Sequence, residues 1–267
     1  MSLSKHNYLN KENTLFYILG VIFISNAILA ELIGVKIFSI EHLFGLDPVN
    51  MTFFGKSGLS FSLTTGVILW PVVFIMTDII NEYYGPKGIK FLSYFTVVLI
   101  LYSFLAITLA IHVPPADFWP KSHLSTGLSP GDYRNGVANY DSAFHLVFGQ
   151  GLYIIIGSVV AFLVSQVIDV YIFHKIKQRT GEKTMWMRST GSTLVSQLID
   201  SFVVLFIAFY IGAGWDMRLV LAIGFVNYIY KFTIAILVTP LLYVIHNIIE
   251  KFLGEEIAER LKREAMG

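Results

Sequence analysis

Long apolar runs separated by short polar segments dominate the hydrophobic pattern of this chain. Each run has about twenty or more residues, and at about 1.5 Å per residue a helix of that length covers a hydrocarbon core of about 30 Å. Because a continuous helix satisfies its own backbone inside lipid, each run predicts a transmembrane helix. We expect six such helices, at about residues 14–38, 61–84, 89–112, 152–173, 188–212 and 219–246. The sequence therefore predicts an all-α membrane protein with one transmembrane domain over residues 14–247.

The polar segments between these runs predict how the domain is bounded. Residues 1–13 are polar, and the run after them is too long for the apolar core of a signal peptide. Gly85-Pro86 separates the second run from the third and is a clear helix terminator. The connection 113–149 begins with prolines and aromatic residues, which is typical of a chain at the membrane surface. Within it, residues 141–148 predict a short interfacial helix, which is either a lid over a binding site or a plain surface helix.

The composition fits a membrane protein and excludes several other classes. Apolar residues make up 55% of the chain and charged residues only 14%, whereas an ordinary soluble domain is about 25% charged. A net charge of +1 gives no bulk field that would attract nucleic acid or an acidic partner. Cysteine is absent, and the 7 histidines form no His-x-x-x-His pair. We therefore expect no metal, no cofactor and no nucleic-acid partner; the expected partners are a small molecule and the lipid bilayer.

The distribution of Lys and Arg predicts the orientation in the membrane. With the N-terminus inside, the segments facing the cytoplasm hold thirteen of these residues. The opposite segments hold four, namely Lys56, Lys121, Arg134 and Arg218. The excess of positive residues inside predicts that both termini are cytoplasmic. The tail 248–267 alternates Glu with Lys and Arg, and is expected to be a solvated charged helix.

A stretch from Arg188 to Gly212 joins a polar first half to an apolar second half without a break. Residues spaced by four share a helical face at about 100° per residue, and this face holds Arg188, Ser192, Ser196 and Asp200. Ionisable groups at membrane depth normally face a bundle interior or a water-filled cavity. We therefore expect the other helices to surround this one.

A short internal sequence repeat supports that interpretation. Residues 165–169 read Ser-Gln-Val-Ile-Asp, and residues 196–200 read Ser-Gln-Leu-Ile-Asp. A transporter built from two repeated halves can show such a weak repeat in its sequence. Chance similarity is the alternative.

Residue counts from the ends of the apolar runs place one group of polar side chains near the middle of the membrane. Each lies about twelve residues, or roughly 18 Å, from a run end, and the group is Asn26, Gln197, Asp200 and Lys231. Lys231 is expected to pair with Asp200 or Glu31, because an unpaired charge is costly there. One carboxylate, one ammonium and two amides suit a neutral, planar, polar ligand. Candidate stacking residues, for each of which core packing is the alternative, are Phe23, Trp70, Phe202 and Tyr228.

A second group lies within about 10 Å of the cytoplasmic face. It comprises Asp78, Glu82, Gln166, Asp169 and Arg188. Asp78 and Asp169 could each reach Arg188, which predicts a gate or an ion network. A structural clamp is the alternative. Glu82 alone is also explained by a solvated helix end near the lipid headgroups.

Several short motifs together resemble a known family. They are Ser25-Asn26, Trp70-Pro71, Thr77-Asp78, Glu82-Tyr-Tyr-Gly85, Ser158, Ala161-Phe162, Ser165-Gln166, Asp169, Trp186-Met-Arg188, Ser192, Gln197-Leu-Ile-Asp200, Tyr230-Lys231 and Thr239-Pro240-Leu-Leu-Tyr243. With these motifs the chain resembles the queuosine precursor transporters, a family also known as putative vitamin uptake transporters, over about residues 14–247. One departure is Gly149-Gln150-Gly151-Leu152, where relatives tend to carry an arginine.

The resemblance implies a multi-pass protein of the bacterial inner membrane. Its implied function is import of 7-deazaguanine precursors of queuosine for tRNA modification, mainly 7-cyano-7-deazaguanine, with 7-aminomethyl-7-deazaguanine as a further candidate. The implied six-helix fold is similar to that of the substrate-binding components of energy-coupling-factor transporters. Together with the mid-membrane group, this predicts a carrier that works by alternating access.

Two other functions compete with that of a stand-alone carrier. A substrate-binding component of an ATPase-driven vitamin or nucleobase transporter would need small residues in steps of four to dock its partner. Ala27 and Ala30 are three apart, so a partner ATPase is not indicated. An intramembrane enzyme is disfavoured because no familiar catalytic motif is present. The sequence leaves open a homo-oligomer, the driving force and the preferred deazapurine.

Overall fold

The computed structural model describes residues 10–121, 139–180 and 185–265, and most of them are helical. Within these residues, five helical segments are long and apolar enough to cross a membrane. They are Lys11–Ile33, Trp70–His112, Tyr140–Thr180, Trp186–Ile211 and Met217–Leu253. This confirms a predominantly helical, multi-pass membrane protein. Residues 122–138, the middle of the expected surface connection, lie outside the described residues.

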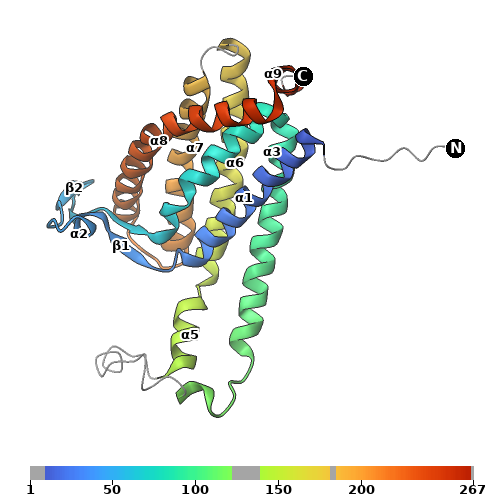
Figure 1. Ribbon diagram of the computed structural model, residues 1–267. Helices are drawn as coiled ribbons and strands as arrows, with labels where there is room; N and C mark the ends of the chain where they lie inside the picture. The colour runs from blue at the N-terminus through green and yellow to red at the C-terminus, as the bar shows by residue number, and fades with distance from the viewer. Residues whose placement is uncertain (1–9, 122–138, 181–184, 266–267) are drawn as a thin grey trace.

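The helices form a bundle in which helices distant in sequence lie together (Figure 1). Its main members are α1 (Lys11–Ile33), α3 (Trp70–His112), α6 (Leu152–Thr180), α7 (Met185–Leu205) and α8 (Met217–Leu253). A π-helical turn, Phe206–Ile211, extends α7, and a short helix α5 (Tyr140–Phe148) precedes α6. A helix is therefore present at the expected residues 141–148 and starts one residue earlier, and its position at the membrane interface stays a prediction. Its role as a lid stays a prediction.

Helix α3 is divided by Gly85, whose φ of 66° and ψ of −175° are not helical. Pro86 follows and has no amide hydrogen with which to continue the helix. Figure 1 shows the chain turning back here, near α9 (Glu255–Glu264), so that the two halves of α3 run in different directions. The halves correspond to the expected second and third runs. The count of six membrane crossings depends on this break and stays a prediction.

Replacing Gly85 by alanine is expected to destabilise the protein by about 1–3 kcal/mol, because this backbone region is essentially restricted to glycine. A Cβ at this position would also lie 3.0 Å from the carbonyl oxygen of Ala265. Thermal unfolding of the purified protein in detergent measures the effect. Gly151→Ala is the matched control, since its Cβ would meet no heavy atom closer than 4.0 Å. Equal melting temperatures for both variants would contradict this role for Gly85.

Short strands connect α1 to α3, where the sequence predicted longer helices. They are β1 (Ile37–Ser39), β2 (Met51–Phe53), β3 (Lys56–Leu59) and β4 (Ser62–Thr64), with the helical turn α2 (Ile40–Leu43) after β1. β1 pairs with β4 and β2 pairs with β3, both antiparallel. The first helix thus ends at Ile33 rather than residue 38, and the next begins at Trp70 rather than residue 61.

Hydrogen bonds explain why this connection leaves the helical path. The carboxylate of Glu41 accepts hydrogen bonds from the Phe61 amide at 2.9 Å and the Ser39 hydroxyl at 2.8 Å. Burial raises the pKa of Glu41, but these hydrogen bonds outweigh it and hold the pKa below its usual value. Lys56 pairs with Asp216 at 2.6 Å, which ties the β2–β3 hairpin to the start of α8.

The C-terminal helix α9 packs against the bundle instead of lying free in solvent. Its apolar residues Ala258 and Leu261 are buried in the main hydrophobic core. Arg260 pairs with Glu12 of α1, and Lys262 donates to Glu250 at 2.5 Å. The expectation of a solvated tail is therefore wrong for these residues, because the helix is amphipathic and one face covers the bundle. The side of the membrane on which this end lies stays a prediction.

Candidate functional site

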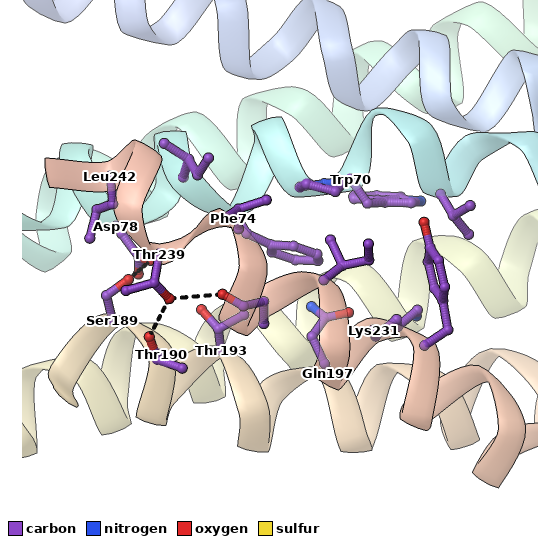
Figure 2. A pocket seen from close by; sticks show the side chains of 17 residues that line it. Trp70, Phe74, Asp78, Ser189, Thr190, Thr193, Gln197, Lys231, Thr239 and Leu242 are labelled. Atoms are coloured by element: carbon purple, nitrogen blue, oxygen red, sulfur yellow. Dashed lines mark hydrogen bonds between the residues drawn. The ribbon is translucent and has the colours of Figure 1, made fainter. Parts of the chain in front are cut away.

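A pocket lies between α3, α7 and α8. Each helix contributes residues spaced by about four, so each presents one continuous face to the pocket. These faces include Trp70, Phe74 and Asp78 from α3, Ser189, Thr193 and Gln197 from α7, and Lys231, Ala235 and Thr239 from α8. Figure 2 shows these side chains converging between the three helices.

The α3 wall of the pocket is aromatic. The rings of Trp70 and Phe74 stack with centroids 6.0 Å apart and an interplanar angle of 22°. Phe162 of α6 packs against Trp70 from behind, with ring centroids 5.8 Å apart. Trp70 and Phe74 both line the pocket. A planar ligand can stack on such rings.

The α7 wall is polar, and its central residue is Gln197. This side chain is only 1% exposed, yet neither its amide nitrogen nor its amide oxygen has a hydrogen-bond partner among the described residues. The Oδ1 atom of Asp78, across the pocket on α3, likewise has none within that part of the chain. An unsatisfied buried polar group costs about 1–3 kcal/mol. Ligand donors and acceptors at these atoms would remove that cost.

Different polar contacts lie at the two ends of the pocket (Figure 2). At one end Lys231 forms an ion pair with Asp200, whose side chain is 20% exposed. At the other end the Ser189 hydroxyl donates to Asp78, and Thr190 lies 3.0 Å from the hydroxyl of Thr239. The pair at the first end balances its own charge. That end of the pocket therefore carries no net charge.

The mid-membrane residues expected from the sequence are only partly brought together. Gln197 and Lys231 line the pocket, and Asp200 is the partner of Lys231, one of the two that were expected. Glu31 is buried elsewhere and accepts from the Ser158 hydroxyl at 2.5 and 2.6 Å. Asn26 does not line the pocket, because its amide donates to the carbonyl of Ile22 in its own helix at 2.8 Å.

Of the four expected stacking residues, Trp70 lines the pocket and the others do not. Phe23 is fully buried in the core, where its ring centroid lies 6.2 Å from that of Phe162. Phe202 packs against Gly224, where a Cβ would lie only 2.7 Å from the ring. Tyr228 makes an edge-to-face contact with Phe232. The core-packing alternative holds for Phe23, whereas Phe202 and Tyr228 are half-buried.

Sequence reasoning missed two aromatic residues that do line the pocket, Phe74 and Tyr230. Phe74 lies midway between Trp70 and Asp78 in steps of four, so the helical period could have indicated it. Tyr230 precedes Lys231 in one of the motifs that carried the family resemblance. Depth alone could not select either residue from the other aromatic residues.

Beyond the Asp78 end of the pocket lies a buried ion network centred on Glu82. This carboxylate contacts Lys177 at 3.1 Å and Arg188 at 2.7 and 3.1 Å. All three residues are at most 1% exposed, so the alternative of a solvated Glu82 is wrong. Lys177 was missed because the predicted fourth run ended at residue 173, whereas α6 continues to Thr180.

The other members of the expected lower group lie beside this network. Asp78 and Asp169 accept hydrogen bonds from serines, Ser189 and Ser196, instead of pairing with Arg188. The Gln166 side chain bonds with the Thr77 hydroxyl at 3.3 Å.

Comparison with known proteins places the pocket within a recognised family. The family described as “Putative vitamin uptake transporter” matches residues 64–245, which include every residue that lines the pocket. A “Probable queuosine precursor transporter” of Bacillus subtilis (strain 168) is 28% identical over 193 residues, covering 70% of this chain and 72% of the relative. A protein of the same description from Haemophilus influenzae (strain ATCC 51907 / DSM 11121 / KW20 / Rd) is 27% identical over 207 residues, covering 76% of each. No solved structure matches.

Proposed function

The chain belongs to the family of putative vitamin uptake transporters, and from this premise we propose that it imports a 7-deazaguanine precursor of queuosine, such as 7-cyano-7-deazaguanine, across the bacterial inner membrane. The two relatives described as probable queuosine precursor transporters support this substrate class. The imported precursor would supply tRNA modification.

The observation that carries the proposal is the pairing of an aromatic wall with unsatisfied polar atoms across one pocket. A deazaguanine is flat, and its ring can stack on Trp70 and Phe74. Its edge carries two adjacent N–H donors, which a carboxylate such as Asp78 can accept in parallel. On its other edge, a ring nitrogen acceptor and the pyrrole N–H match the donor and acceptor of an amide such as Gln197. Figure 2 shows Trp70 and Gln197 on opposite walls of the pocket.

Two features suggest how the pocket would open to each side in turn. The Lys231–Asp200 pair lies at one end, and the Ser189–Asp78 contact lies at the other. Pro240 lies inside α8 beside the pocket residue Thr239, and proline is a frequent site of helix bending. In the proposed cycle, α8 moves against α3 and α7. One of these two contacts then breaks while the other remains formed.

Uptake in living cells tests the proposal. Bacteria that cannot synthesise queuosine precursors and lack their own importer would express this chain and receive labelled 7-cyano-7-deazaguanine. We expect label to enter and queuosine to appear in tRNA, both absent in cells with an empty vector. An excess of unlabelled 7-aminomethyl-7-deazaguanine, which has the same guanine edge, should compete. Adenine, whose edge presents different donors, should not. No uptake above the vector, with the chain present in the membrane, would refute the proposal.

A further inference from the structure

Two buried carboxylates, Asp78 and Asp169, lie where α3 and α6 are joined by the hydrogen bond between Thr77 and Gln166 at 3.3 Å. Asp78 on α3 and Asp169 on α6 are each only 3% exposed, so solvent screens their charges little. Helix α7 holds both of them: the Ser189 hydroxyl donates to Asp78 and the Ser196 hydroxyl donates to Asp169 at 2.9 Å. One oxygen of each, Oδ1 of Asp78 and Oδ2 of Asp169, has no hydrogen-bond partner in the described part of the chain.

Among the residues that the structure describes, the charges around this pair leave an excess of carboxylates. The charged and titratable groups near it on the packed helices are Glu82 of α3, His174 and Lys177 of α6, Arg188 of α7 and His246 of α8. Lys177 and Arg188 both contact Glu82, so the two cations already share one carboxylate. Among these described residues there are three carboxylates, including that of Glu82, and two permanent cations. A buried carboxylate that is not paired takes up a proton instead of remaining charged.

We propose that Asp78 and Asp169 together bind one proton, and that this proton drives substrate import. The inference rests on the proposed transport function, because Asp78 is assigned to binding both the substrate and the proton. When the N–H donors of the ligand reach Oδ1 of Asp78, they favour its charged form, and the proton stays on Asp169. The loaded pocket then carries one buried negative charge, already hydrogen-bonded, rather than two. Without the proton, both carboxylates are ionised and closure around the substrate is opposed. Ionisable chains of this kind within membrane helices are typical of proton relays.

Infrared spectroscopy tests the proton without any substrate. The full-length protein in lipid at neutral pH should show the carbonyl stretch of a protonated carboxylic acid. Asp169→Asn should remove the part due to the pair, because Asp78 alone no longer faces a second carboxylate. Asp47→Asn, which changes an exposed loop carboxylate, is the matched control and should leave the band unchanged. Identical spectra for Asp169→Asn and the unmodified protein would overturn the proposal.

Proteoliposomes test the coupling, with labelled 7-cyano-7-deazaguanine as the probe. An interior one pH unit more alkaline should drive up to about tenfold accumulation for one proton per substrate. Asp169→Asn should still exchange labelled for unlabelled substrate without a gradient, but should not accumulate it. Asp47→Asn should both exchange and accumulate the substrate.

Accumulation that does not depend on the pH gradient, or that depends on a sodium gradient, would overturn the proposal. So would loss of exchange together with accumulation in a folded Asp169→Asn protein. Absence of exchange in the unmodified protein would instead refute the proposed substrate, and the infrared result would decide the proton site.

Discussion

Gln197→Leu is expected to weaken binding of 7-cyano-7-deazaguanine by about tenfold or more and, at the same time, to stabilise the empty protein. The first effect follows from the loss of two ligand hydrogen bonds, each worth about 0.5–1.5 kcal/mol, since about 1.4 kcal/mol is a factor of ten in affinity. The second follows because both amide atoms are buried without partners in the described structure. Removing them relieves a cost of about 1–3 kcal/mol. Calorimetric titration measures binding, and unfolding in detergent measures stability.

Gln166→Leu is the matched control for this prediction. Gln166 is also buried, at 3% exposure, but its side chain bonds with Thr77. The same change of residue type should therefore destabilise the protein, because it leaves the Thr77 hydroxyl without that contact. If both variants lose stability equally, Gln197 is an ordinary core residue. If Gln197→Leu binds the ligand as tightly as the unmodified protein, the ligand does not sit against α7.

This contrast shows which part of the site the sequence can predict. Gln197 and Lys231 were expected in the pocket from their depth, and both line it. Depth follows from counting residues along a helix, and the count is reliable where a helix is straight. The angle around each helix axis depends on how the helices pack against one another. Asn26 has the expected depth but bonds within its own helix, so depth alone could not exclude it.

The fold shows the same division between what local patterns specify and what packing decides. Apolar runs predicted the long helices, and Gly85-Pro86 predicted the break in α3. The strands between α1 and α3 depend on long-range contacts instead. The bond from the Phe61 amide to Glu41 spans twenty residues, and β1 pairs with β4 across a similar separation. Such pairings leave little periodic signal in a short, mixed segment, so the adjoining helices were predicted too long.

The amphipathic tail illustrates a third limit. Alternating charges in α9 are typical of a solvated helix, and its apolar positions are few. Its buried face is explained only by the surface that receives it, at the break where Ala265 approaches Gly85. Lys177 was missed for a related reason, because a lysine beyond an apolar run is normally assigned to solvent. Here the helix continues past the run and the ammonium reaches Glu82 inside the bundle.

Glu82→Gln is expected to reduce the free energy of unfolding by about 3–5 kcal/mol, more than Gly85→Ala, because it breaks a buried ion pair and leaves charge behind. The glutamine keeps the shape of the side chain, so packing is preserved. Lys177 and Arg188, each at most 1% exposed, would both lose this carboxylate. Unfolding by titration with a denaturing detergent measures the change.

Glu259→Gln separates burial from pairing as the cause. Glu259 pairs with Arg263 at 3.5 Å, but both side chains are more than 60% exposed. Exposed pairs contribute about 0–1 kcal/mol, so this variant should unfold almost like the unmodified protein. A Lys177→Met change added to Glu82→Gln should then cost less than the sum of the two single changes, because it removes one of the charges that the first change leaves buried. Additive losses would mean that Lys177 and Glu82 are not energetically coupled. The stability that the buried ion network provides would then come from the pair of Arg188 and Glu82.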